Sequence, residues 1–339
     1  MTPTWSTARP APEEEKPEEK SHDDSAPVLV GEGGPTEAGW HSAEAGIWCL
    51  QEAQYKYIRG ISLPHLQTPD HFAVGGMLHA GRATWFGSKF DTSQATIDAV
   101  KAATLKAADS FSLPVTEDAK KAATKYVLEY VEFWSGRPRP QPLAAEYLVG
   151  PAPVQVGDQF PLWRTARLDD VSRYPEASNK LAIGEAKTTS GSIDDCINQY
   201  TLHGQPILQF VLWGTSEQGE RRHGPLAGFV LDIIKKGYGK DRSKFAREFV
   251  EVTPKTLEWY RRSLRAYLRR FANLDWNSDA DDQRNIMACT RMVGRARMAC
   301  EYRPLCRHGK AAASNYVLRD GTPLNEWKPS PGNETEPWK

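Results

Sequence analysis

The stretch from Leu181 to Thr189, with the sequence LAIGEAKTT, constrains the fold of this chain more than any other. It begins as a short apolar run, which is typical of a buried strand. Glu185 and Lys187 are two residues apart in this run, and side chains two apart on a strand point to the same face. The pattern therefore predicts a carboxylate and an ammonium side by side at the end of a buried strand.

A second strand-like run, from Arg164 to Asp170, lies upstream and ends in acidic residues. If the two strands pair, Asp169 and Glu185 converge on one hard cation, with Lys187 beside it. Two acidic oxygens with water suit Mg²⁺ or Mn²⁺, and such a metal can activate water and stabilise charge on a phosphate. The alternative is a solvated strand end with an ordinary Glu/Lys pair, since such triplets are common by chance.

The order of Asp169, Glu185 and Lys187 resembles the PD-(D/E)xK nuclease superfamily, and within it the RecB/AddB-like branch that includes CRISPR-adaptation nucleases. The resemblance implies an α/β fold with a restriction-endonuclease-like core, in which helices flank a mixed central β-sheet, and a cysteine-stapled C-terminal segment. It also implies that Asp169, Glu185 and the Ala186 carbonyl hold the metal. Lys187 would orient or deprotonate the attacking water and offset charge at the phosphate.

Three further elements of that family have counterparts in the chain. Gly76 to His79 matches a Gly-x-x-His element whose His stands near the metal, although a lone His is more often structural. Glu146 lies where the family has another acidic residue; the alternative is a charge at a strand edge. A Gln-x-x-x-Tyr element is matched in part, because Gln209 is followed by Trp213 rather than Tyr, and Gln205 has the expected local setting. Either Gln can therefore fill this role.

Five cysteines are distributed unevenly. Cys289, Cys300 and Cys306 cluster near the end, whereas Cys49 and Cys196 stand alone. In a cytosolic protein such a cluster favours metal binding over disulfides. A lone N-terminal Cys with a C-terminal triad resembles the [4Fe–4S] staple of AddB-type nucleases, which implies Cys49 and the triad as ligands. Four thiolates would also suit Zn²⁺. Cys196 is then a buried structural residue.

The formal net charge is zero, with 43 basic and 43 acidic residues, but the charges are unevenly placed. Residues 1–40 are acidic, and the segment 235–307 is rich in Lys and Arg. A helix is expected over 254–271, and three arginines recur every four residues on one face of it: Arg261, Arg265 and Arg269. This face is either a stripe that follows phosphates or an ordinary solvated surface.

The composition and periodicity predict the domain organisation. We expect a disordered acidic tail over 1–40, a nuclease domain over 41–310 and a C-terminal tail over 311–339. Within the domain we expect a helical part (41–140), a catalytic sheet (141–253), and a basic helix with the Cys cluster (254–307). Helices are predicted at 93–108, 116–134 and 191–204, and strands at 143–150, 160–169, 181–188, 226–234 and 248–252. The sequence shows neither a signal-peptide core nor an apolar run of membrane length, so a cytoplasmic location is expected.

Together these features predict a metal-dependent DNA nuclease that uses Mg²⁺ or Mn²⁺. The resemblance favours exonuclease action at DNA ends, single-stranded ends above all, in recombination, replication or repair. It also suggests a bacteriophage or mobile-element context and a recombination or replication protein as partner. Two alternatives remain: a non-catalytic nucleic-acid-binding protein with an iron–sulphur or zinc site, and a zinc-stapled enzyme of different chemistry.

Overall fold

The computed structural model describes most of the chain between residues 68 and 272, with shorter segments on either side. The described residues are 29–30, 49, 55–56, 61, 63–64, 68–111, 113–155, 161–201, 203–237, 242–272, 290–293, 296–318 and 322–326. Cys289 and nearly all of the expected acidic tail lie outside them. Of that tail, Leu29 and Val30 are described, and they pair with the central sheet.

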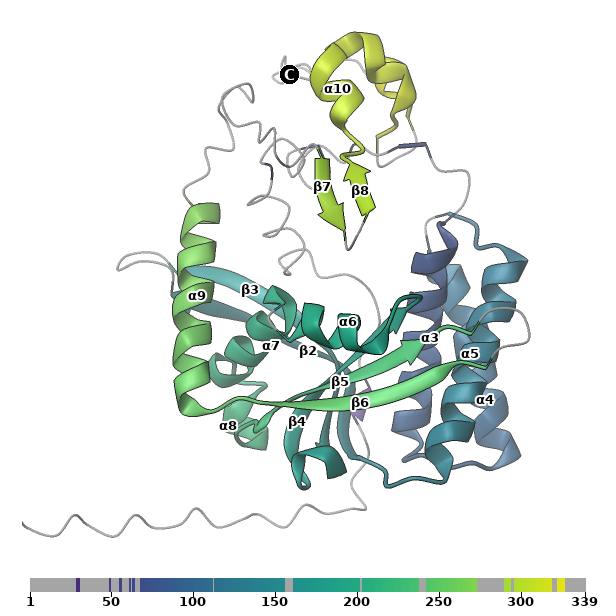
Figure 1. Ribbon diagram of the computed structural model, residues 1–339, viewed down its shortest axis with the longest axis vertical. Coiled ribbons are helices and arrows are strands. Elements are labelled where there is room, and N and C mark those ends of the chain that lie inside the picture. The colour runs from purple at the N-terminus through teal and green to yellow at the C-terminus, as the bar shows by residue number, and fades with distance from the viewer. Residues whose placement is uncertain are drawn as a thin grey trace, which may run out of the picture.

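A mixed sheet forms the centre of the molecule (Figure 1), with strand order β1-β2-β3-β4-β5-β6. The pairs β1–β2 and β4–β5 are parallel, and the other three are antiparallel. The strands are β1 (Leu29–Val30), β2 (Gln141–Gln155), β3 (Pro161–Tyr174), β4 (Lys180–Thr189), β5 (Gly228–Lys235) and β6 (Lys244–Glu251). The expected α/β fold with a mixed central sheet flanked by helices is therefore confirmed.

Strand β4 lies between β3 and β5, and all of its residues from Leu181 to Ala186 are buried. This confirms the predicted buried strand. Its pairing with β3 places Gly184 opposite Asp170, so the neighbouring residues Asp169 and Glu185 come close together. The predicted hairpin of β3 and β4 is thus present, and it brings the two acidic residues to one place.

The end of β3 differs from the prediction, which placed it at Asp169. The strand continues to Tyr174, and the connection to β4 contains a short 3-10 helix, η3 (Pro175–Ala177). The sequence pattern predicted no strand between residues 169 and 181, where polar residues are frequent. In the structure Ser172 and Tyr174 are buried and donate hydrogen bonds to the carboxylate of Asp170. These polar side chains therefore satisfy one another inside the sheet, which makes a loop unnecessary.

Three helices before the sheet pack together beside it (Figure 1): α3 (Asp70–Gly87), α4 (Gln94–Lys106) with its 3-10 extension η2 (Ala107–Ser110), and α5 (Glu117–Ser135). The two predicted helices are thus confirmed, and Thr116 caps α5 by accepting a hydrogen bond from the Ala119 amide. These helices share a helix core, whose largest members include Met77, Leu78, Trp85, Phe86, Val127 and Tyr130. Ala145 of β2 and Ile234 of β5 join it, which fixes α3 against the sheet.

The other helices are α6 (Ile193–Tyr200), α7 (Gly204–Thr215), α8 (Glu220–His223) and α9 (Pro254–Ala272). The helix predicted over 191–204 is shorter in the structure, because α6 ends at Tyr200 and His203 caps the start of α7. Both α7 and α9 contribute to a sheet core, whose members include Leu168, Ile183, Leu208, Leu212, Phe229 and Leu264. Cys196 is buried in this core, as expected for a structural residue.

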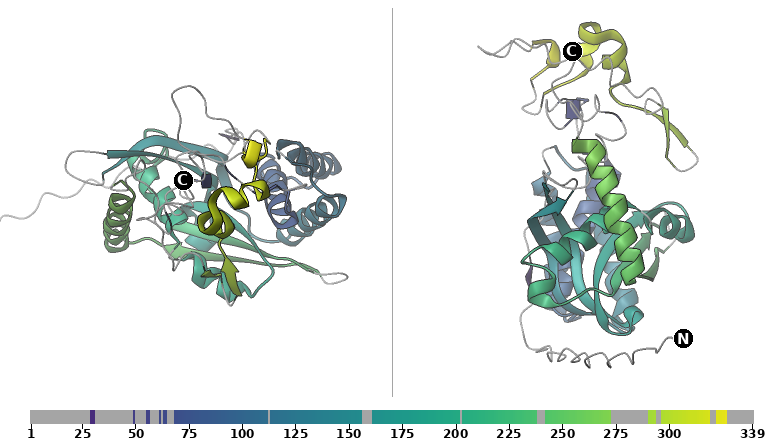
Figure 2. Two further views of the ribbon diagram at one scale, coloured as in Figure 1. Left: turned by 90° about the horizontal axis from the view of Figure 1, so that it is seen from above. Right: turned by 90° about the vertical axis from the view of Figure 1, so that its left-hand side faces the viewer.

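The C-terminal elements lie beyond the upper end of α9 (Figure 2). They are β7 (Thr290–Val293), β8 (Ala296–Ala299), α10 (Arg303–His308), η6 (Gly309–Asn315) and η7 (Leu324–Glu326). A C-terminal core joins them to an early segment of the chain, and its members include Tyr55, Ile61, Cys300, Tyr302, Leu305, Ala313, Tyr316 and Leu324. The predicted boundary at residue 310 is therefore too early, because residues beyond it bury apolar side chains in this core.

Candidate metal centre and active site

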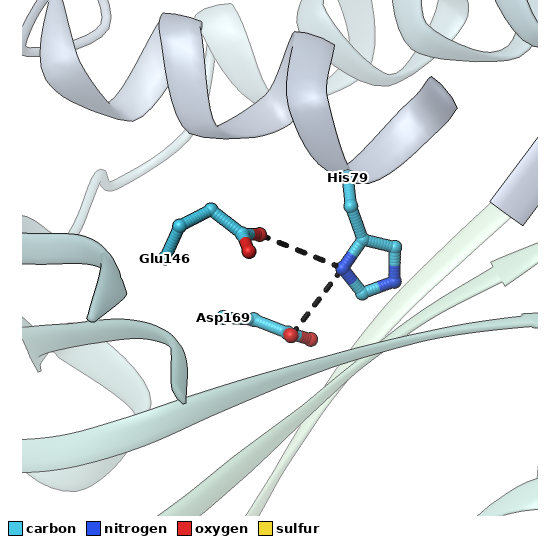
Figure 3. Close-up of side chains that lie close together, drawn as sticks. All are labelled: His79, Glu146 and Asp169. Atoms are coloured by element: carbon cyan, nitrogen blue, oxygen red, sulfur yellow. Dashed lines mark ion pairs between the residues drawn. The ribbon is translucent and has the colours of Figure 1, made fainter. Parts of the chain in front are cut away.

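Helix α3 carries His79 toward the sheet (Figure 3). The helix approaches α4 and α5 closely because Gly81 has no side chain. A Cβ at Gly81 would lie 2.2 Å from Thr104 Oγ1 and 2.9 Å from Val127 Cγ2. The packing of α3 on its neighbours therefore sets the position of His79.

His79, Glu146 and Asp169 form a compact group of three (Figure 3). Their ligand atoms all lie within 4.8 Å of one another. His79 Nδ1 is 3.3 Å from Asp169 Oδ1 and 3.9 Å from Glu146 Oε1. All three were predicted as metal ligands, and the structure brings them together from α3, β2 and β3. One imidazole nitrogen and two carboxylates are a donor set that can hold a divalent cation.

The backbone at Glu146 has an unusual conformation, with φ of 49°. The residue lies between Ala145, which pairs with Asp170, and Tyr147, which pairs with Leu168, so the register places it across from Asp169. A left-handed conformation is rare for a residue with a side chain, and such strain concentrates at functional sites. The conformation accompanies the turn of the Glu146 carboxylate toward Asp169 and His79.

Glu185 is fully buried and is surrounded by polar partners rather than by the group of three. Lys187 forms a close ion pair with Glu185 Oε1. Gln205 Nε2 donates to Oε1 at 2.8 Å, and Gln209 Nε2 donates to Oε2 at 2.9 Å. Both candidate glutamines therefore bind the same carboxylate, one to each oxygen, from the first two turns of α7. Glu185 itself does not belong to the compact metal-ligand group.

A backbone hydrogen bond connects the two clusters. The Ala186 amide donates to Asp169 Oδ2 at 2.7 Å, which orients the carboxylate whose other oxygen faces His79. Gly184, two residues earlier on β4, leaves room for the neighbouring acid Asp170, because a Cβ there would lie 2.0 Å from Asp170 Oδ2 and 2.1 Å from the Tyr174 hydroxyl. Ala186 was predicted to contribute its carbonyl to a metal. The structure shows its amide bound to Asp169.

The electrostatics of the group of three favour a cation. Burial, reinforced by the nearby Asp169 carboxylate, raises the pKa of Glu146 to about 7. Burial lowers the pKa of His79, but the charge of Asp169 and a hydrogen bond to it outweigh burial and give a net increase. Burial raises the pKa of Asp169, and the charge of His79 outweighs it and gives a net decrease. At neutral pH Asp169 is therefore ionised and Glu146 is about half protonated, and a bound cation would favour the ionised form of both carboxylates.

The Glu185–Lys187 pair is also strongly perturbed. Burial raises the pKa of Glu185 despite the positive charge of Lys187. Burial lowers the pKa of Lys187, but the Glu185 and Asp169 carboxylates outweigh it and raise the pKa above its usual value. The ammonium also lies 4.9 Å from the centre of the Tyr200 ring, on α6. Lys187 is therefore held in its charged form, which suits a group that binds an anion.

The structure separates the other predicted site residues from this centre. Arg261, Arg265 and Arg269 are exposed on α9, whose buried face packs into the sheet core. Cys300 and Cys306 belong to the C-terminal core, and Cys49 is buried. Cys289 lies outside the described residues, and the compact group of possible metal ligands found among the described residues contains no cysteine, so the four-cysteine group stays a prediction.

Sequence reasoning missed a buried network of charges next to the site. Arg82, one turn after His79 on α3, bonds Asp170 Oδ2 at 2.6 Å and Asp232 Oδ2 at 3.1 Å. Arg247 Nε lies 3.3 Å from the same Asp232 oxygen, and Tyr130 donates to that oxygen as well. Two guanidinium groups thus balance two carboxylates. One signal was available, because Asp170 directly follows the predicted ligand Asp169.

The chain was compared with known proteins. It matches no model of a protein family, and the search of curated proteins finds no significant match.

Among the described residues, no helix combines the length and the apolar character that crossing a membrane requires.

Proposed function

We propose that the chain is a metal-dependent DNA nuclease of the PD-(D/E)xK type, similar to the RecB/AddB-like branch. One observation carries the proposal: His79, Glu146 and Asp169 converge beside a buried Glu185–Lys187 pair. A group able to hold a cation thus lies next to a fixed ammonium. Each group would promote hydrolysis of a phosphodiester, since each offsets negative charge that develops on the reacting phosphate.

Mg²⁺ or Mn²⁺ fits the group of three by its chemistry. The carboxylates of Glu146 and Asp169 supply hard oxygen ligands, and His79 supplies a nitrogen, which Mn²⁺ accepts readily. The high pKa of Glu146 also indicates a site where a cation would relieve repulsion between two carboxylates. When bound, the ion would lower the pKa of a water and offset charge on the phosphate.

In this proposal Lys187 is the fixed positive group of the reaction. Its raised pKa keeps the ammonium protonated, which favours orienting the attacking water or binding a phosphate oxygen over removing a proton. Glu185 holds Lys187 in place, and Gln205 and Gln209 in turn hold Glu185. These three residues are therefore positioning residues.

The arrangement of β2, β3 and β4 as an antiparallel unit followed by parallel β5 supports a restriction-endonuclease-like core within this proposal. We also propose that the cysteines hold a [4Fe–4S] cluster, or else Zn²⁺. Cys300 and Cys306 share one core with Tyr55 and Ile61, which follow Cys49 closely in the chain. This proximity supports a site that joins early and late segments.

The test incubates the purified protein with end-labelled single- and double-stranded DNA and Mn²⁺. Wild type is expected to cut, and Asp169→Asn to cut more than about 100-fold more slowly, because it removes a charged ligand. Binding of Mn²⁺, followed by the electron paramagnetic resonance signal of the free ion, should weaken in the same variant. Asp194→Asn on α6, an exposed position nearby, is the matched control and should behave as wild type.

Asp169 is buried, so its substitution could also disturb folding. His79→Gln is the second variant, because His79 is more exposed, and it should show the same two losses while the circular dichroism spectrum stays native. A wild-type protein that binds DNA but cuts neither substrate with Mg²⁺ or Mn²⁺ would contradict the proposal. It would instead indicate a non-catalytic nucleic-acid-binding protein.

A further inference from the structure

Helix α9 presents a strongly cationic face to solvent. Its apolar side packs into the sheet core through Tyr260, Leu264 and Leu268. The exposed side carries five basic residues: Lys255, Arg261, Arg262, Arg265 and Arg269. Between residues 254 and 269 the sequence has a single acid, Glu258, whose Oε1 lies 3.7 Å from Arg262 Nε. The local charge of this face is therefore clearly positive, although the chain as a whole is neutral.

A large aromatic side chain lies at one edge of this exposed side. Trp259 is 43% exposed, which is unusual for a tryptophan. On a helix, residues three and four apart are neighbours, so Lys255 and Arg262 flank Trp259 on the surface. The helix lies on the outside of the molecule in both views (Figure 2), so a ligand has access to it.

We infer that this face of α9, the basic α9 face, binds single-stranded nucleic acid, with phosphates on the arginines and a base stacked on Trp259. Aromatic platforms interleaved with cations are the common design of sites for single strands. A duplex presents its phosphates but not the faces of its bases. The arginines therefore account for attraction to any polyanion, and Trp259 accounts for the preference for a single strand.

Two other ligands carry negative charge, a membrane surface and an acidic protein. A helix that lies in a membrane interface needs a wide apolar face turned to the lipid, whereas the apolar face of α9 is buried in the protein. An acidic protein would satisfy the arginines but would leave the flat exposed indole without a matching partner. The combination of charge and an aromatic surface favours nucleic acid.

That the nucleic acid is DNA and not RNA rests on the proposed function. The basic α9 face lies away from the catalytic centre. Helix α9 contacts α7. A Cβ added at Gly214, near the end of α7, would lie 3.9 Å from Arg261 Nη2. The catalytic centre lies at the other end of α7, at Gln205, which is about 14 Å away along the helix. The basic α9 face would thus hold a strand outside the catalytic centre.

The experiment measures binding without cutting. Wild type and variants are titrated in EDTA into a fluorescently labelled single-stranded oligonucleotide, and into the same oligonucleotide as a duplex, with anisotropy as the readout. Trp259→Ala should weaken single-strand binding on the order of tenfold and leave duplex binding nearly unchanged. Trp259→Phe should keep most of the affinity. Arg265→Gln should lower the affinity for both the single strand and the duplex. It should also reduce the salt dependence of binding by about one released counterion.

Phe72→Ala is the matched control, because Phe72 is an aromatic residue that is 65% exposed on α3, away from the cationic face. It should bind as wild type. Equal loss for both ligands in Trp259→Ala, or no loss, would overturn the inference, as would competition by polyglutamate as effective as that by the oligonucleotide. The result is independent of catalysis. A protein that binds as expected but never cuts contradicts only the proposed nuclease. A protein that cuts DNA but lacks this binding pattern contradicts only the present inference.

Discussion

At the scale of single residues, the site depends on the partners of Glu185. A buried carboxylate is costly unless its charge and hydrogen bonds are satisfied. Lys187 supplies the opposite charge, while Gln205 and Gln209 bind one oxygen each. Both oxygens of the Glu185 carboxylate are therefore bound by protein side chains. The compact ligand group of His79, Glu146 and Asp169 forms beside it. In the proposed mechanism, Glu185 positions Lys187, while Glu146 and Asp169 would bind the metal.

The buried network behind the site predicts a large effect on stability. Asp170→Asn removes one of two carboxylates that balance Arg82 and Arg247, and it leaves an excess positive charge in the interior. We expect the free energy of unfolding to fall by about 3 kcal/mol, because breaking a buried ion pair exposes the remaining charge to a low-dielectric surrounding. Urea denaturation followed by circular dichroism measures the change.

The control for Asp170→Asn is a pair on the surface. Asp98 and Lys101 form an exposed ion pair on α4, with 3.5 Å between Lys101 Nζ and Asp98 Oδ1. Asp98→Asn should leave the denaturation midpoint nearly unchanged, since solvent screens such pairs. Similar losses in the two variants would show that burial does not decide the effect, contrary to this account.

The sequence was sufficient to predict the residues of the candidate site but not the buried charges that pack behind them. Asp169, Glu185 and Lys187 lie on short strands with a recognisable spacing, and His79 and Glu146 followed from family motifs. Arg82 is separated from its partners Asp170 and Asp232 by 88 and 150 residues. An arginine inside a helix gives no local sign that it is buried, so only the packing of α3 on the sheet reveals its role.

At the scale of elements, apolar periodicity located α4, α5, α9, β4 and β5 to within a few positions. It failed where polar residues are buried. No strand was predicted at Ser172 and Tyr174, yet both belong to β3, where Asp170 accepts their hydrogen bonds. Local pattern therefore predicts elements well where burial follows hydrophobicity.

Helix α5 offers a test of local capping. Thr116 Oγ1 accepts a hydrogen bond from the Ala119 amide at 3.1 Å and donates one to Asp70 Oδ1, at the start of α3, at 2.8 Å. Thr116→Ala removes both, and we expect a loss of about 1 kcal/mol in the free energy of unfolding. Thr116→Ser keeps the hydroxyl and should lose much less. Thermal denaturation of the two variants compares them, and equal losses would refute a role for the hydroxyl.

At the scale of the whole molecule, three apolar cores account for the organisation of the described residues. The helix core and the sheet core lie against the central sheet, and the C-terminal core joins an early segment to a late one. Composition predicted a single nuclease domain with tails at both ends. It could not show that residues beyond 310 are packed, because their apolar side chains are few and widely spaced in the sequence.

The C-terminal core leads to a prediction for the cysteines. If Cys300 and Cys306 bind an iron–sulphur cluster, anaerobically purified protein should contain iron and show broad visible absorbance. The Cys306→Ser variant should lose both the iron and the absorbance. Cys196→Ser is the matched control and should keep them, because Cys196 lies in the sheet core. Zinc in a colourless protein would indicate the alternative metal. A wild-type protein with neither iron nor zinc would contradict a metal site at these cysteines.

The C-terminal core also has a consequence for folding during synthesis on the ribosome. The Tyr302 hydroxyl donates to the Ile61 carbonyl at 2.8 Å, and these residues are 241 positions apart. At typical rates of translation, roughly 10 to 50 s pass between the synthesis of Ile61 and that of Tyr302. During that interval the apolar side chains of Tyr55 and Ile61 lack their final partners, although the sheet can already form. The early segment therefore depends on the nascent chain being finished, and a stalled ribosome would leave it exposed to chaperones and proteases.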